Sequence, residues 1–169
     1  MEKKVFLVGF MGSGKTTIGR LLAKKLKVPF VDIDEEIEIR EGLKIPEIFA
    51  LKGENYFRKL ELEVLKEITL SLPSFVMATG GGLGANPRAM EFMKKHGTVV
   101  WLDIDFDTFL RRTSKDPNRP LLKRGEEKLK KLFEERKKVY SLADIKVKSQ
   151  KSVELTLKKL LEELEKSTS

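Results

Sequence analysis

The sequence has no cysteine and a single histidine, His96, among its 169 residues. Without cysteine, a disulfide framework, a thiolate nucleophile and a cysteine-based zinc site are all excluded. His96 precedes a glycine, and we expect it to cap the end of a helix. No apolar run approaches the roughly 20 residues of a membrane span, and the chain enters a short apolar stretch directly after its first four residues. We therefore expect a soluble, cytoplasmic protein with one domain over residues 1–169.

Acidic residues are fewer than basic ones, 26 against 34, which gives a formal net charge of +8. Such an excess can indicate a nucleic acid or an anionic substrate as partner. Many lysines, however, alternate with leucine and glutamate near residues 128–132 and 157–164, as on the solvated face of a helix. Interleaved aromatic and basic residues, which bind single strands, are missing. We expect no nucleic acid and no membrane partner, and a nucleotide-dependent nucleic-acid binder remains the alternative from another class.

Residues 9–16 read GFMGSGKT and fit the phosphate-loop pattern G-x-x-x-x-G-K-[ST]. The apolar run at residues 4–8 predicts a buried strand before the loop, and apolar residues at helical spacing follow it. A phosphate loop needs this order, because backbone N–H groups at the helix start converge on the anion. Lys15 would then reach the β- and γ-phosphates and the Thr16 hydroxyl would bind Mg²⁺. The alternative is a glycine-rich turn that only resembles the pattern.

Strands and helices are expected to alternate along the whole chain. Short apolar runs predict five strands, at residues 4–8, 30–34, 75–79, 98–102 and 143–147. Helical patterns lie between them, for example at residues 54–70, at residues 106–113 and after Asn86 and Pro87, which form an N-cap and first-turn signal. Right-handed crossovers then give an α/β fold with a mainly parallel five-stranded sheet and helices on both faces.

Ligands of such folds bind outside the carboxyl ends of the strands. The phosphate loop, the pair Asp32 and Asp34, and the run Gly80–Gly82 follow the first three strands, so we expect them to line one crevice. The two aspartates lie two residues apart, which places them on one face if the strand continues. One could hold Mg²⁺ through water while the other acts on a hydroxyl. The alternative for either is a helix cap.

Two glycine- and proline-rich segments also admit two readings. The triple glycine either lets the backbone approach a small ligand closely or makes a tight turn. Residues 114–125 combine two prolines with four basic residues and little periodicity. This segment is either a plain connection or a lid that brings Arg119 over a bound phosphate, and we favour the lid.

Taken together, these motifs resemble the shikimate kinase family in order and spacing. The matching stretches are Gly9–Arg20, Asp32–Asp34, Ile48–Phe49, Gly53–Glu54, Phe57–Glu61, Gly80–Gly82, Arg119–Leu122, Glu135–Arg136 and Tyr140. The resemblance implies a P-loop NTPase fold of the nucleoside monophosphate kinase type with a mobile lid. It also implies transfer of the γ-phosphoryl of ATP to the 3-hydroxyl of shikimate, in aromatic amino acid biosynthesis.

The resemblance further implies how shikimate is bound. Arg58 and Arg136 would hold its carboxylate, since a planar guanidinium suits that task. Asp34 would bind the ring hydroxyls and act on the one being phosphorylated. The apolar wall would be Phe49 and Phe57, and the backbone contacts would come from Gly80, Gly81 and Gly82. From the residues alone, Arg58 could instead pair with Glu54 and Glu61, and Arg136 could be a solvated side chain.

On the nucleotide side, the resemblance assigns ATP and Mg²⁺ to named residues. The implied nucleotide contacts are Gly12, Ser13, Gly14, Lys15, Thr16, Thr17, Arg112 and Arg119, the implied metal ligands are Thr16 and Asp32, and the implied catalytic groups are Lys15, Asp34 and Arg119. Family members often carry an arginine after the last strand, whereas residues 149–152 contain none. We expect a monomer, and the alternative within the enzyme class is a related kinase of gluconate or of a nucleoside monophosphate.

Overall fold

The computed structural model describes residues 3–113 and 122–168, with the backbone alone considered for residues 112–113, 122–124 and 168. Within these residues five strands form one parallel sheet in the order β2-β3-β1-β4-β5. The strands are β1 (Lys4–Val8), β2 (Phe30–Asp32), β3 (Phe75–Ala78), β4 (Thr98–Asp103) and β5 (Ile145–Lys148). The predicted parallel sheet is confirmed.

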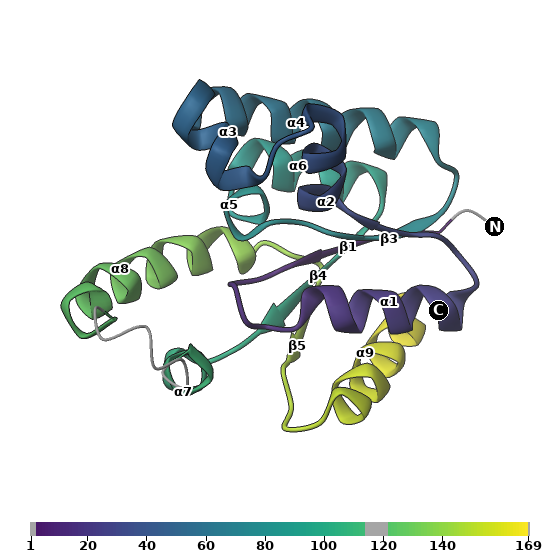
Figure 1. The fold of residues 1–169 in the computed structure, drawn as a ribbon. Coiled ribbons are helices and arrows are strands. Elements are labelled where there is room, and N and C mark those ends of the chain that lie inside the picture. Colours follow the sequence, from purple (N-terminus) through teal and green to yellow (C-terminus); the bar gives the residue numbers. More distant parts are fainter. Residues whose placement is uncertain (1–2, 114–121, 169) are drawn as a thin grey trace.

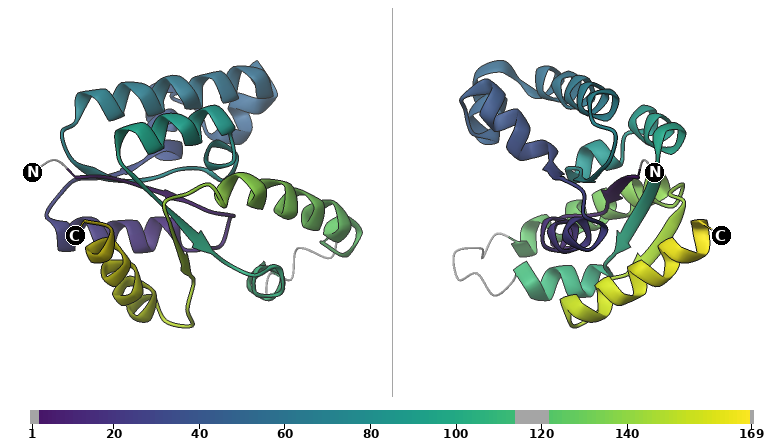
Figure 2. Two further views of the ribbon diagram at one scale, coloured as in Figure 1. Left: turned by 180° about the vertical axis from the view of Figure 1, so that it is seen from behind. Right: turned by 90° about the vertical axis from the view of Figure 1, so that its right-hand side faces the viewer.

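Helices cover both faces of the sheet, as predicted (Figure 1). They are α1 (Lys15–Leu26), α2 (Ile33–Glu41), α3 (Ile45–Lys52), α4 (Glu54–Ser71), α5 (Gly81–Gly84), α6 (Pro87–His96), α7 (Phe106–Thr113), α8 (Leu122–Tyr140) and α9 (Val153–Thr168). The views in Figure 2 place α1 and α9 against one face and α2 to α6 against the other. Helix α8 runs outward from the sheet on the side of the phosphate loop. No helix in the described residues combines the length and apolar composition needed to cross a bilayer.

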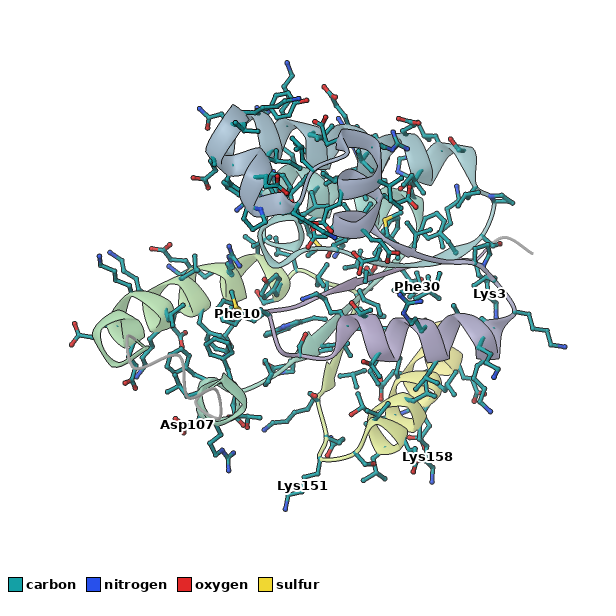
Figure 3. The ribbon with its side chains drawn as sticks, in the orientation of Figure 1. Lys3, Phe10, Phe30, Asp107, Lys151 and Lys158 are labelled. Atoms are coloured by element: carbon teal, nitrogen blue, oxygen red, sulfur yellow. The ribbon has the colours of Figure 1, made fainter. Side chains whose placement is uncertain are left out.

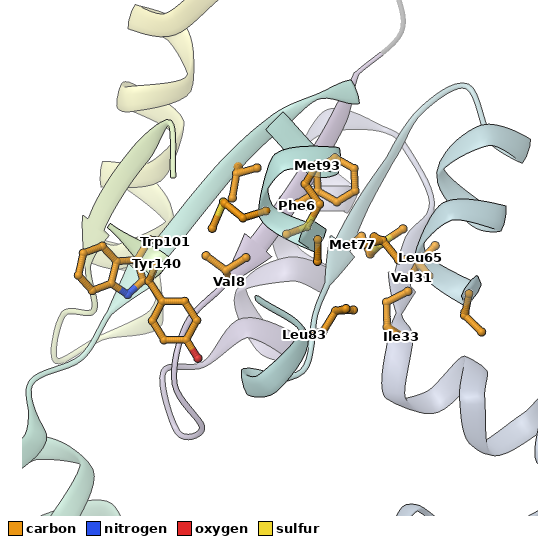
Figure 4. Close-up of a cluster of buried hydrophobic side chains, with 14 of the residues drawn as sticks. Phe6, Val8, Val31, Ile33, Leu65, Met77, Leu83, Met93, Trp101 and Tyr140 are labelled. Carbon is orange, nitrogen blue, oxygen red and sulfur yellow. The ribbon is translucent and has the colours of Figure 1, made fainter. Parts of the chain in front are cut away.

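The central strand β1 contributes side chains to both hydrophobic cores, one on each face of the sheet. Phe6 and Val8 pack into the cluster under α4 and α6, which also includes Leu65 and Met77 (Figure 4). Val5 and Leu7 point to the other face and pack with residues of α1 and α9. A strand that is buried on both faces is apolar at every position, which is why residues 5–8 show a continuous apolar run rather than alternation.

The order of the strands creates one position where ligands bind. After β1 the chain crosses to β2, at the edge of the sheet on the β3 side of β1. After β3 it crosses in the other direction, to β4 on the opposite side of β1. The connections therefore leave in opposite directions at the carboxyl end of β1, which opens a crevice there. The phosphate loop, at residues 9–16, lies at this point.

The predicted strand at residues 30–34 is too long by two residues. Asp32 ends β2, and its Oδ1 accepts a hydrogen bond of 3.2 Å from the Glu35 N–H. This N-cap turns the chain into α2 at Ile33, because it satisfies an N–H at the helix start. Asp34 therefore lies in the first helical turn, and the expectation of two aspartates on one strand face was wrong. The alternative reading of Asp32 as a helix cap is confirmed.

Two further segments are more helical than the sequence indicated. Gly81–Gly84 form the short helix α5 rather than a plain turn. Helix α8 begins at Leu122, so residues 122–125 of the predicted lid are helical, whereas residues 114–121 lie outside the described residues. Asn86 caps α6 as predicted, with its side chain accepting hydrogen bonds from two N–H groups. His96 is the last residue of that helix, and its Nδ1 lies 2.8 Å from the Phe92 carbonyl.

Candidate functional site

The phosphate loop leads from β1 into α1 through three glycines with positive φ. Gly9, Gly12 and Gly14 have φ of 150°, 80° and 91°, backbone angles that residues other than glycine rarely adopt. A Cβ atom at Gly9 would lie 2.6 Å from the Leu102 carbonyl oxygen, so the loop packs directly on β4. Within the described chain no side chain caps the start of α1, where Gly14 is the N-cap. The first N–H groups of α1 are thus left to an external anion.

The loop borders a cavity of about 360 Å³ that also includes both aspartates and part of the triple glycine. Its lining residues are Met11, Gly12, Ser13, Gly14, Lys15, Thr16, Thr17, Asp32, Asp34, Ala78, Thr79, Gly80 and Gly81. The ends of β1, β2 and β3 therefore meet in one crevice, as the sequence predicted.

Lys15 is partly buried and lines this cavity. Its Nζ donates hydrogen bonds to the carbonyl oxygens of Gly9 and, at 3.3 Å, of Phe10. Burial lowers the pKa of Lys15 from 10.5 to about 8, and the charge of Asp34 partly opposes this shift. An anion that binds beside Lys15 stabilises its charged form, so the ammonium group suits a phosphate.

The acids beside Lys15 differ in their surroundings. Burial raises the pKa of Asp34, and the negative charge of Asp32 adds to that effect. Asp32 Oδ2 accepts a hydrogen bond of 3.3 Å from the Thr16 hydroxyl. A hydroxyl and a carboxylate oxygen side by side fit Mg²⁺, which keeps several waters and takes its other ligands from phosphates. No group of three or more acidic, histidine or cysteine side chains that could hold a metal occurs among the described residues.

Three charged side chains from other parts of the chain lie against the triple glycine. A Cβ atom at Gly80 would lie 3.0 Å from Asp34 Oδ1, and one at Gly81 would lie 2.7 Å from Arg136 Nη1. A Cβ at Gly82 would overlap the Arg58 guanidinium, with its Cζ at 2.7 Å. The three glycines thus give space to one acid and two cations, and Asp34, Arg58 and Arg136 converge here from α2, α4 and α8.

Arg58 is fixed in place by neighbours on its own helix. Its Nη1 lies 2.8 Å from Glu61 Oε1, and its Nε lies 3.6 Å from Glu54 Oε1. The ion pairs that the sequence suggested as an alternative are therefore present. Glu61 is only 2 % exposed, and burial raises its pKa against the opposing effect of Arg58. The guanidinium also lies over the Phe57 ring, 5.5 Å from its centroid, so its position is determined from several directions.

Phe49 and Phe57 form an apolar wall next to Arg58. Their ring centroids lie 4.8 Å apart, and the Arg58 Cζ lies 5.9 Å from the Phe49 ring. A second hollow of about 260 Å³ is bounded by residues that include Arg58, Gly82 and Arg136. Both predicted carboxylate-binding arginines line it.

Arg136 has no carboxylate within ion-pair distance in the described part of the chain, in contrast to Arg58. Its guanidinium instead lies over the Phe10 ring, with Cζ 5.8 Å from the centroid. Figure 3 shows Phe10 where the phosphate loop meets α8, and its ring also packs against Phe133 on α8 at 5.1 Å. Among the described residues, the contacts that position the Arg136 guanidinium thus come from neutral groups.

Two predicted nucleotide contacts cannot be placed in this site. Arg112 lies near the end of α7, at a position for which only the backbone is considered, and Arg119 lies outside the described residues. The loop after β5, which contains no arginine, contacts the phosphate loop through the Ser149 hydroxyl, which donates to the Ser13 carbonyl at 3.4 Å.

The sequence analysis assigned no role to Phe10 or Tyr140 and named Glu61 only as a possible ion-pair partner of Arg58, although each contacts a predicted site residue. Glu61 could have been found, because it lies four residues after Phe57 and four before Leu65, within the apolar stripe of α4. A charged residue at such a position is buried only with a partner. Phe10 and Tyr140 gave no such signal, because an aromatic side chain at a buried position is expected in any hydrophobic core.

A phosphate loop beside an acid and two arginines has the groups needed to bind a phosphorylated donor next to an anionic, hydroxylated acceptor. The fold and the site together define a small-molecule kinase with a P-loop NTPase fold. The comparisons with known proteins identify the family within this class. The model of the family described as shikimate kinase matches residues 11–165, and the chain belongs to this family.

Individual relatives agree with this assignment. The shikimate kinase of Aquifex aeolicus is 54 % identical over 162 residues, which are 96 % of each chain. The crystal structure of shikimate kinase from that organism has a TM-score of 0.90 and covers 98 % of each chain at 53 % identity. The shikimate kinase of Acinetobacter baumannii in complex with shikimate has a TM-score of 0.86 at 38 % identity, and covers 100 % of this chain and 97 % of that one. A gluconokinase from Sinorhizobium meliloti, 14 % identical with a TM-score of 0.52, shares the fold alone.

Proposed function

We propose that this protein transfers the γ-phosphoryl group of ATP to the 3-hydroxyl of shikimate, giving 3-phosphoshikimate and ADP for aromatic amino acid biosynthesis. The observation that carries this proposal is the convergence of Asp34, Arg58 and Arg136 on the triple glycine, next to the phosphate loop. Shikimate has a carboxylate at one end and three hydroxyls, so it needs cations at one end of its site and an acid at the other.

The acceptor is held through both kinds of group. Arg58 and Arg136 bind the carboxylate, and among the described residues no acid lies within ion-pair distance of Arg136. Asp34 accepts hydrogen bonds from ring hydroxyls on the side facing Lys15, while the ring of shikimate packs against Phe49 and Phe57. Because the pKa of Asp34 is raised, its carboxylate is a better base than an ordinary aspartate for the proton of the attacking 3-hydroxyl.

The donor is held by the amides of the phosphate loop and by Lys15. Negative charge builds on the transferred group and on the leaving oxygen, and the Lys15 ammonium and the N–H groups of residues 12–17 stabilise it. Thr16 and Asp32 would hold Mg²⁺, which supplies charge neutralisation on the phosphate oxygens when bound. By resemblance to the family, we assign Arg119, on a lid over residues 114–125 that excludes water, to the phosphates. We assign Arg112, which precedes this lid, to the adenine.

The remaining expectations follow from the reaction. ATP and shikimate are small, water-soluble metabolites, so we propose a cytoplasmic enzyme that works as a monomer with one kinase domain over residues 1–169. All proposed contacts with both substrates come from a single chain. Neither a nucleic acid nor a membrane is required for this chemistry.

A substrate panel tests the proposal. The purified protein is incubated with Mg²⁺-ATP and with shikimate, gluconate or a nucleoside monophosphate, and ADP release is followed by a coupled assay. We expect ADP release to depend on shikimate, and the product to carry phosphate on the 3-oxygen by NMR. Asp34→Asn should lower kcat by about 10²- to 10⁴-fold while the protein still binds ATP. Turnover with another acceptor and no stimulation by shikimate would refute the proposed function.

A further inference from the structure

Tyr140, the last residue of α8, has a buried hydroxyl group beside the triple glycine. The residue is 1 % exposed, and its ring packs near Trp101 of β4, with centroids 6.1 Å apart (Figure 4). The phenol O–H donates a hydrogen bond of 2.7 Å to the Gly81 carbonyl oxygen. A residue of α8 thus fixes the backbone of the glycine that gives space to the Arg136 guanidinium.

The same hydroxyl group also faces Arg136, one helical turn before it on α8. Burial raises the pKa of Tyr140 to about 12, and the charge of Arg136 together with a side-chain hydrogen bond from it opposes this shift. A Cβ atom at Gly81 would lie 2.7 Å from Arg136 Nη1 and 3.6 Å from the Tyr140 hydroxyl oxygen, so both groups lie against this glycine while the O–H donates to its carbonyl. One neutral group bridges the arginine and the glycine backbone.

We propose that Tyr140 is a positioning residue for the acceptor site, which holds Arg136 and Gly81 at a fixed distance so that the guanidinium meets the substrate carboxylate. This inference rests on the proposed role of Arg136 in shikimate binding. Tyr140 does not contact the reacting atoms and acts through Arg136. It complements the Phe10 ring, which supports the same guanidinium from the side of the phosphate loop.

The neutrality of the bridging group matters for this role. Arg58 is held by two glutamates, which neutralise part of its charge, whereas Tyr140 orients Arg136 without reducing its charge. A hydroxyl with a pKa near 12 stays protonated throughout the working range of an enzyme, so the hydrogen bond to Gly81 does not change with pH. The acceptor carboxylate would thus meet one arginine that is paired with glutamates and one that, among the described residues, has no acid within ion-pair distance.

The test compares Tyr140→Phe, which removes the hydroxyl and keeps the ring, with Thr69→Val. Thr69 is a matched control, because its buried hydroxyl also donates a 2.7 Å hydrogen bond to a backbone carbonyl, that of Leu65 near the end of α4. We expect Tyr140→Phe to raise the KM for shikimate about three- to tenfold, the range for one lost hydrogen bond. The KM for ATP and kcat should change less than about twofold, and Thr69→Val should leave both KM values unchanged.

Arg136→Lys separates failure of this inference from failure of the proposed site. If Arg136→Lys raises the KM for shikimate and Tyr140→Phe does not, the positioning role is overturned while the site stands. If Tyr140→Phe raises both KM values alike, or changes only the melting temperature as Thr69→Val does, its hydroxyl is merely structural and the inference fails. If Arg136→Lys leaves the KM for shikimate unchanged, both the role of Arg136 and the inference are wrong.

Discussion

Gly82→Ala is the sharpest test of the acceptor site, because the added methyl group enters space that Arg58 occupies. The new Cβ would lie 2.7 Å from Arg58 Cζ and 2.9 Å from Nη2, both closer than Cβ atoms approach other atoms. Moving the Arg58 side chain breaks its ion pair with Glu61 and its contact with the Phe57 ring, but it is the one group that can give way to the methyl group. The guanidinium must therefore leave the position in which it would meet the carboxylate of shikimate.

The size of the effect follows from the hydrogen bonds at stake. A hydrogen bond to a charged group contributes about 1.5–3 kcal/mol. Since about 1.4 kcal/mol is a factor of ten, loss of one such bond raises the KM for shikimate roughly 10- to 150-fold. The backbone of Gly82 is helical and φ there is not positive, so alanine itself introduces no strain and removes about 0.5–1 kcal/mol of unfolded-state freedom. We expect the melting temperature to stay within a few degrees.

Steady-state kinetics with varied shikimate and varied ATP measure this prediction, and a double-mutant cycle supplies its control. In an Arg58→Ala background, Gly82→Ala should have no further effect on the KM for shikimate, because the side chain that it displaces is gone. Melting curves check that all variants are folded. An unchanged KM for shikimate in Gly82→Ala, or an equal rise in both backgrounds, would refute the argument that the methyl group acts through Arg58.

Three further predictions concern the charged groups. Lys15 has a pKa of about 8 in the free protein, so kcat/KM for ATP should fall above that pH as the ammonium loses its proton. Lys15→Arg should abolish this fall, because arginine keeps its charge. An identical pH profile in both proteins would contradict the prediction. Thr16→Val removes a proposed metal ligand and should raise the Mg²⁺ concentration needed for half-maximal rate by about tenfold, whereas Thr16→Ser should not. Because the pKa of Glu61 is raised, the folded protein binds more protons than the unfolded chain between about pH 4.5 and the raised value, and this part of the stability is lost as pH rises through that window. Glu61→Gln lacks this loss. Urea unfolding should therefore show that its free energy of unfolding, relative to that of the parent protein, is higher at pH 8 than at pH 5. An equal difference at both pH values would be inconsistent with a raised pKa.

The fold could be predicted from the sequence because its signals are local. The phosphate loop lies between an apolar run and a helical pattern, and its glycines stand where φ is positive. Asn86 and Pro87 marked the start of α6 correctly. Buried parallel strands are apolar throughout and helices are apolar at every third or fourth residue, so the two differ within a few residues. The helix at Gly81–Gly84 was not predicted, and some boundaries were inaccurate, as at Asp32, where one capping hydrogen bond decides between strand and helix.

The amino-acid sequence by itself therefore determined the α/β class, the phosphate loop and the family, since each depends on residues that are neighbours along the chain. The tertiary structure decided what stands beside the triple glycine. Arg58 and Arg136 are 78 residues apart, and the hydrogen bond from Tyr140 to Gly81 spans 59 residues. Nothing in the local pattern of α4 or α8 distinguishes these side chains from solvated ones, because their distance from the glycines is set by how the helices pack on the sheet.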